Sequence, residues 1–162
     1  MSDKNTQVNF NLANPVQFLA LGFGSGLAPK APGTFGTLAA VPLFLLMSDL
    51  SPLIYGLLVL FVCITGIYIC GKAAEDVGVH DHGAIVWDEF AGFFITMFMV
   101  PVSWQSVLVG FILFRVFDIA KPYPISVADK KLTGGFGIMF DDVLAGLFAL
   151  AIMQTLVYFQ FF

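Results

Sequence analysis

Three long stretches of this 162-residue sequence carry almost no charge, and they restrict the chain to folds with apolar surroundings. Asp49 is the only charged residue in 34–70, and none occurs in 90–114 or 143–162. Charged residues make up 11% of the chain and hydrophobic residues 59%, against roughly 25% and 45–50% in soluble domains. So few charges cannot cover a soluble globule of this size. We therefore expect a membrane protein, and the net charge of −4 argues against a nucleic-acid partner.

Polar turns at 48–52 and 100–103 divide the first two stretches. A bilayer core about 30 Å thick takes roughly 20 apolar residues per helix. The sequence thus predicts an all-α, polytopic membrane bundle with helices at roughly 34–48, 53–71, 85–100, 104–120 and 138 to the C-terminus. The first and third are short for a full span, so four membrane helices are the alternative to five. Residues 1–162 are expected to form one domain, with 1–13 as a flexible cytoplasmic tail.

Basic residues fall on one side of the membrane in this arrangement. With five spans, the two polar turns and the C-terminus share a side without Lys or Arg, so all seven lie on the other side. Because Lys and Arg favour the cytoplasmic side, the N-terminus and the loops at 72–84 and 121–137 are predicted to be cytoplasmic. Every acidic residue except Asp49 also lies at or near that face, where we expect the active site.

Two glycine-rich segments accompany this predicted site. Residues 22–36 hold five Gly and two Pro, which argue for an irregular loop, preceded by an interfacial helix from Asn14 to near Ala20. The second segment is 134–137. Consecutive backbone amides in such turns can bind an anion. The residues of these segments that we assign to anion binding are Gly33, Thr34, Gly134 and Gly135.

Acidic residues stand at the ends of the predicted membrane helices. The pairs Asp88-Glu89 and Asp141-Asp142 each open a helix, and Asp118 closes one. A carboxylate inside a span costs about 2.5–3.5 kcal/mol, which favours a functional role. The alternative is stabilisation of helix N-termini. That alternative explains adjacent acids less well. Neighbouring residues on a helix point about 100° apart, so only one of the two easily faces outward.

Ala-Gly follows both acidic pairs, at 91–92 and 145–146. Small residues let helix backbones approach closely, so we expect the two helices to bring their carboxylates together. Repulsion among these carboxylates then requires a cation, and oxygen ligands select Mg²⁺, Mn²⁺ or Ca²⁺. The predicted metal ligands are Asp88, Glu89, Asp141 and Asp142.

Basic residues lie beside these acids. Arg115 and Asp118 are three apart on one helix face, which predicts either an internal ion pair or, together with Lys121, a pair of cations that bind phosphate oxygens. Residues 80–82, His-Asp-His, form either a metal or proton-transfer site or a polar turn. No cysteine-phosphatase, Walker A or serine-elbow motif occurs, so phosphate chemistry would depend on metal and carboxylates.

Four ordered motifs resemble the bacterial phosphatidylglycerophosphatase A family. They are 22–36 with its Ala-Pro-Gly-Thr, 85–92, 115–124 and 134–146. The resemblance covers about residues 14–150. It implies Mg²⁺-dependent hydrolysis of phosphatidylglycerophosphate to phosphatidylglycerol and phosphate in phospholipid biosynthesis. The protein would be a multi-pass protein of the bacterial inner membrane, with its active site facing the cytoplasm.

The mechanism expected from this resemblance uses some carboxylates to hold Mg²⁺ and a free one to orient or deprotonate the attacking water. The catalytic carboxylates are Asp88, Glu89, Asp118, Asp141 and Asp142. Arg115 and Lys121 would neutralise phosphate oxygens. The sequence permits either direct attack by water or an aspartyl-phosphate intermediate.

Two other functions compete with a phosphatase. A small cation carrier or channel subunit would use the same acids as a cation path, and a structural membrane subunit would give them no role. A carrier predicts ionisable residues through the whole membrane depth, whereas here they gather at one face.

Overall fold

The computed structural model describes residues 8–162, and within them the chain folds into helices and has no strand. The described helices, in chain order, are α1 (Pro15–Ala20), the 3₁₀ helix η1 (Ser25–Leu27), α2 (Pro32–Met47), α3 (Pro52–Val77), α4 (Trp87–Thr96), α5 (Trp104–Ala120), α6 (Ile125–Lys131) and α7 (Gly134–Tyr158). The all-α prediction is confirmed. Residues 1–7 of the predicted tail lie outside the described residues.

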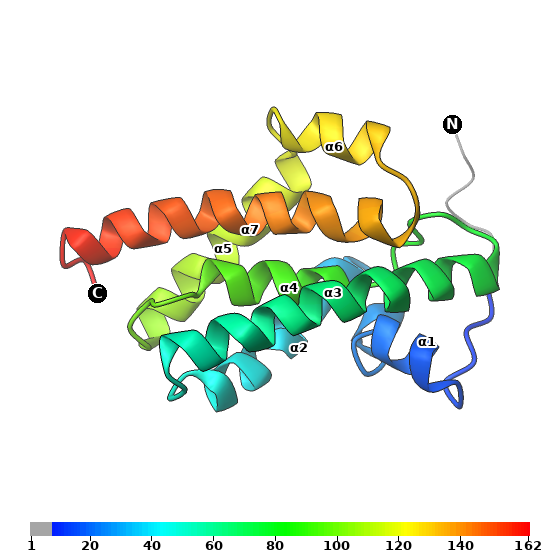
Figure 1. Ribbon diagram of the computed structural model, residues 1–162, viewed down its shortest axis with the longest axis horizontal. Helices are drawn as coiled ribbons and strands as arrows, with labels where there is room; N and C mark the ends of the chain where they lie inside the picture. Colours follow the sequence, from blue (N-terminus) through cyan, green and yellow to red (C-terminus); the bar gives the residue numbers. More distant parts are fainter. Residues whose placement is uncertain (1–7) are drawn as a thin grey trace.

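Helices α3 and α7 form the long axis of the molecule. They run side by side in opposite directions (Figure 1) and contact each other. Among the described helices, these two are long and apolar enough to cross a membrane, with 26 and 25 residues. Helix α2 is apolar but shorter.

Helix α4 is the centre of the bundle and contacts α2, α3, α5 and α7. Eight of its ten residues are buried. It is shorter than the predicted helix at 85–100, because Val86 has a non-helical φ of −135° at its start and Met99 adopts a left-handed φ of 57° after its end. Val86 instead donates its backbone N–H to the carbonyl of Ala20. At 1.5 Å per residue, α4 is about 15 Å long, half the thickness of a bilayer core.

Helix α5 begins and ends where the sequence predicts. Ser103 and Ser106 form a reciprocal capping box at its start, and Lys121 ends it with a left-handed φ of 41°. Helix α1 also matches its prediction, since Asn14 caps it by accepting a hydrogen bond from Val16 N. Helix α6 was not predicted.

The prediction of irregular loops at the glycine-rich segments is wrong in part. Pro32 occupies the first turn of α2, a position that proline favours, so Gly33 and Thr34 are helical. Gly134 and Gly135 likewise belong to the first turn of α7. Packing overrides the weak helix propensity of glycine here; a side chain at Gly135, for example, would overlap the carbonyl of a residue on α3.

Glycines also set the distance between α4 and α7. A Cβ built on Gly146 would lie 2.5 Å from the carbonyl oxygen of Gly92, and one on Gly92 would lie 2.9 Å from the carbonyl oxygen of Asp142. Only glycine allows so close an approach at these two positions. The expected contact between the Ala-Gly segments is therefore confirmed, and it brings the two acidic pairs together.

Candidate active site

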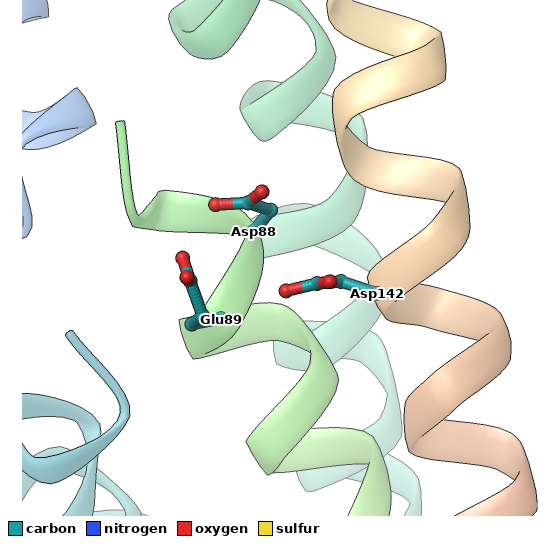
Figure 2. A group of neighbouring side chains, drawn as sticks. All are labelled: Asp88, Glu89 and Asp142. Atoms are coloured by element: carbon teal, nitrogen blue, oxygen red, sulfur yellow. The ribbon is translucent and has the colours of Figure 1, made fainter. Parts of the chain in front are cut away.

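Three carboxylates converge between α4 and α7. Asp88 and Glu89 lie in the first turn of α4, and Asp142 lies on the facing side of α7. Figure 2 shows the three side chains directed into the same space. One oxygen from each lies within 4.8 Å of the others. The two acidic pairs of the sequence thus contribute to one cluster.

These carboxylates are buried and only partly satisfied. The exposed fractions of Asp88, Glu89 and Asp142 are 7%, 8% and 2%. Asp88 Oδ1, Glu89 Oε2 and Asp142 Oδ2 accept no hydrogen bond from the described residues. Buried oxygens without a donor are strongly unfavourable, and a set made only of oxygen ligands suits a hard divalent cation such as Mg²⁺. The three residues therefore fit such an ion.

A second acidic triad overlaps the first. Oxygens of Asp118, Asp141 and Asp142 also lie within 4.8 Å of one another, and Asp142 belongs to both triads. Asp118 comes from the last turn of α5. The structure therefore brings together all five carboxylates that the sequence singles out.

Arg115 connects α5 to both triads. Its Nη1 lies 2.6 Å from Asp118 Oδ2 and 3.6 Å from Glu89 Oε1. The ion pair with Asp118 was one of the two predicted arrangements. Its Nε has no hydrogen-bond partner among the described residues, so the guanidinium keeps donor capacity beside the acids. A phosphate oxygen would satisfy that capacity.

Lys121 joins α6 to the second triad. Its Nζ lies 2.5 Å from Asp129 Oδ1 and 2.5 Å from Asp141 Oδ2. Partial burial lowers the pKa of Lys121, but hydrogen bonds with Asp129 and Asp141 outweigh it, and the pKa is raised overall. Lys121 therefore stays cationic at physiological pH. The sequence analysis missed Asp129, because nothing in the pattern shows that α6 folds back onto Lys121.

The predicted glycine and threonine positions separate into two groups. A Cβ on Gly33 would overlap Glu89 Oε1 and lie 2.9 Å from Arg115 Nη2, so the start of α2, which includes Thr34, borders the site. Gly134 and Gly135 precede Asp141 by more than one helical turn. Gly135 packs on the backbone of α3, so the structure does not bring this pair to the carboxylates.

Residues 80–82 form a turn that holds the start of α7. His80 Nε2 accepts a hydrogen bond of 2.8 Å from Gly134 N. His82 Nδ1 accepts one of 3.1 Å from Ala84 N. The polar-turn interpretation therefore accounts for both histidines, and neither belongs to the acidic triads.

The acidic site lies in the part of the chain that matches a known family. The family model described as Phosphatidylglycerophosphatase A matches residues 18–157. The chain belongs to the phosphatidylglycerophosphatase A family. That match includes both acidic triads, Arg115, Lys121 and Gly33.

Two relatives carry the phosphatidylglycerophosphatase A name. The chain is 48% identical over 143 residues to the protein of Escherichia coli, covering 88% of this chain and 83% of that protein. It is 47% identical over 162 residues to the protein of Haemophilus influenzae, covering 99% of each. No solved structure matches the chain.

Proposed function

We propose that this chain hydrolyses phosphatidylglycerophosphate to phosphatidylglycerol and phosphate. Membership of the phosphatidylglycerophosphatase A family supports the reaction and the substrate. The assignment of the site rests on the two acidic triads that share Asp142. Some of their buried oxygens lack a hydrogen-bond donor, and two basic residues lie beside them. A cation carrier would need such groups along the membrane depth, whereas α3 between Pro52 and Gly71 and α7 after Asp142 are free of charge.

The first triad is the proposed Mg²⁺ site, held by Asp88, Glu89 and Asp142, with Asp141 next to it on α7. When bound, Mg²⁺ would neutralise charge on the phosphate. Without a cation, three buried carboxylates so close together repel one another. Cation binding would therefore offset the repulsion among these three carboxylates.

The basic residues have separable roles in this proposal. Arg115 would donate to two phosphate oxygens, because its planar fork matches their spacing. Lys121 holds Asp141 and Asp129 and adds a positive charge at the rim of the site. A carboxylate of the second triad would accept the proton of the attacking water as the water oxygen forms a bond to phosphorus. The bond between phosphorus and the oxygen of the headgroup glycerol would then break, and that oxygen would take up the proton that the carboxylate accepted.

We further propose four to five membrane-embedded helices in the bacterial inner membrane, with the site facing the cytoplasm. The turns between α2 and α3 and between α4 and α5 gather with the C-terminus at one end of the bundle (Figure 1). These segments contain no Lys or Arg. The positive-inside rule therefore favours that end as the outer one.

The test is phosphate release from phosphatidylglycerophosphate in detergent micelles, with and without metal. We expect EDTA to abolish release and Mg²⁺ to restore it. Asp142→Asn should lower kcat by at least about a hundredfold, because Asp142 serves both triads. Mg²⁺ should raise the Tm of the wild type but not that of Asp142→Asn.

Asp49→Asn is the matched control for Asp142→Asn. It makes the same chemical change at an exposed aspartate in the turn between α2 and α3, so activity and the Mg²⁺ response of Tm should be unchanged. Full activity of Asp142→Asn, or full activity in EDTA, would contradict the proposed metal site. Absence of release from the wild type with Mg²⁺ would contradict the proposed substrate.

A further inference from the structure

An apolar groove runs along the seam between α2 and α5. Its volume is about 570 Å³, within the roughly 300–1,000 Å³ range of small-molecule sites. Its walls are almost entirely carbon. The main lining residues are Leu38, Val41 and Leu45 of α2 and Trp104, Leu108 and Phe111 of α5.

The α2 wall of the groove continues into the acidic site. Leu38, Val41 and Leu45 are three or four residues apart, so they share one face of the helix. One step of four residues toward the N-terminus reaches Thr34 on the same face. The neighbouring Gly33 lies against Glu89.

The α5 wall shows the same continuity. Trp104, Leu108 and Phe111 share a face, and a further step of four residues reaches Arg115. The backbone of Gly33 approaches the guanidinium of Arg115 closely. The two helices therefore meet at the acidic end, and the groove leads away from it between them.

We propose that this groove binds an acyl chain of the lipid substrate while the substrate's phosphate lies at Arg115. This inference rests on the proposed function, because it assumes a phospholipid substrate. The eleven residue steps from Trp104 to Arg115 span about 16 Å of helix. That length is close to half of a 30 Å bilayer core, which is the depth of one lipid leaflet.

The position of the groove distinguishes it from the rest of the apolar surface. Leu38 and Leu60 are equally exposed, at 55% and 54%, but Leu60 lies on α3 and does not line the groove. General contact with surrounding lipid would treat the two leucines alike. Of these two leucines, only Leu38 would affect the binding of a substrate chain in the groove.

The test compares chain-length preference in groove variants and in a matched control. Leu38→Trp and Leu108→Trp would fill the groove, and Leu60→Trp is the control. Each protein is assayed with dipalmitoyl and dihexanoyl phosphatidylglycerophosphate at the same mole fraction in the same detergent micelles. The readout is the ratio of kcat/KM for the long-chain substrate to kcat/KM for the short-chain substrate.

We expect the two groove variants to lower this ratio about tenfold, the size of effect that altered apolar contacts in a pocket produce. Their activity on the dihexanoyl substrate should match the wild type, which also shows that they fold. Leu60→Trp should leave the ratio unchanged. An equal ratio in groove variants, control and wild type would overturn the acyl-chain site and leave the proposed reaction intact. If the wild type instead releases phosphate from neither substrate, both the proposed reaction and the groove proposal are overturned.

Discussion

Arg115 is the residue at which a structural role and a proposed substrate-binding role overlap. It pairs with Asp118 on its own helix and approaches Glu89 on α4, while its Nε has no partner among the described residues. A purely structural arginine would use its donors within the protein. The unused donor next to buried carboxylates instead points toward an anionic ligand.

Arg115→Lys separates these roles. If the guanidinium binds the substrate phosphate, a lysine cannot replace its planar fork, and activity should fall by about 10²–10³, equivalent to about 2.7–4 kcal/mol. The Mg²⁺-induced rise in Tm should persist, because arginine is not a metal ligand. Steady-state kinetics and thermal unfolding on the same preparation measure both effects. Near-normal kinetics in a less stable variant would leave only the ion pair with Asp118.

The site acids could be predicted from the sequence because charges are conspicuous in apolar surroundings. Asp88-Glu89 and Asp141-Asp142 stand at the edges of long charge-free stretches, and the Ala-Gly that follows each pair indicates their close packing. The Lys121–Asp129 ion pair could not be predicted. It depends on α6, and a seven-residue helix is not stable without its tertiary contacts.

At the level of helices, the crossing of α4 and α7 controls the geometry of the site. Gly146 lies on the backbone of Gly92, about one turn beyond Asp142 on α7. Any side chain at Gly146 would push the two helices apart. It would therefore separate Asp142 from the acids of α4.

Gly146→Ala should lower the free energy of unfolding by about 1–3 kcal/mol, since overpacking forces the backbones to shift. Gly56→Ala is the control, because its Cβ would lie 3.7 Å from the ring of Phe98, an ordinary contact. It should be neutral or stabilising by up to about 1 kcal/mol, as expected for Gly→Ala inside a helix. Thermal unfolding in one detergent compares the two. Equal stability of the two variants would argue against a tight crossing.

Helix ends were predictable where polar residues mark them, as at Ser103 and Lys121 of α5. They were not predictable where packing decides. Gly135 lies in the first turn of α7, where its backbone packs directly on α3. At the start of α4, Val86 donates its N–H to the carbonyl of Ala20, a contact between distant parts of the chain.

For the whole molecule, the one-sided distribution of basic residues predicts its orientation. The substitution Thr133→Cys places a thiol in the exposed segment before α7, and Leu50→Cys places one in the turn between α2 and α3. In intact cells, a membrane-impermeant thiol reagent should label Leu50→Cys and spare Thr133→Cys. The unmodified chain, with Cys63 and Cys70 in α3, provides the background. The reverse labelling pattern would invert the orientation.

The groove between α2 and α5 lies on the flank of the bundle, and five of its nine lining side chains are exposed, Leu38 and Leu108 among them. A ligand dissolved in the bilayer reaches such a flank by lateral diffusion, so its supply depends on molecules per unit area of membrane and not on their bulk concentration. The two products would then separate by phase: phosphate leaves into water, whereas the dephosphorylated lipid returns to the leaflet from which it came. Dilution of the substrate with inert lipid at constant total substrate should consequently slow turnover, as expected for a catalyst that works in two dimensions.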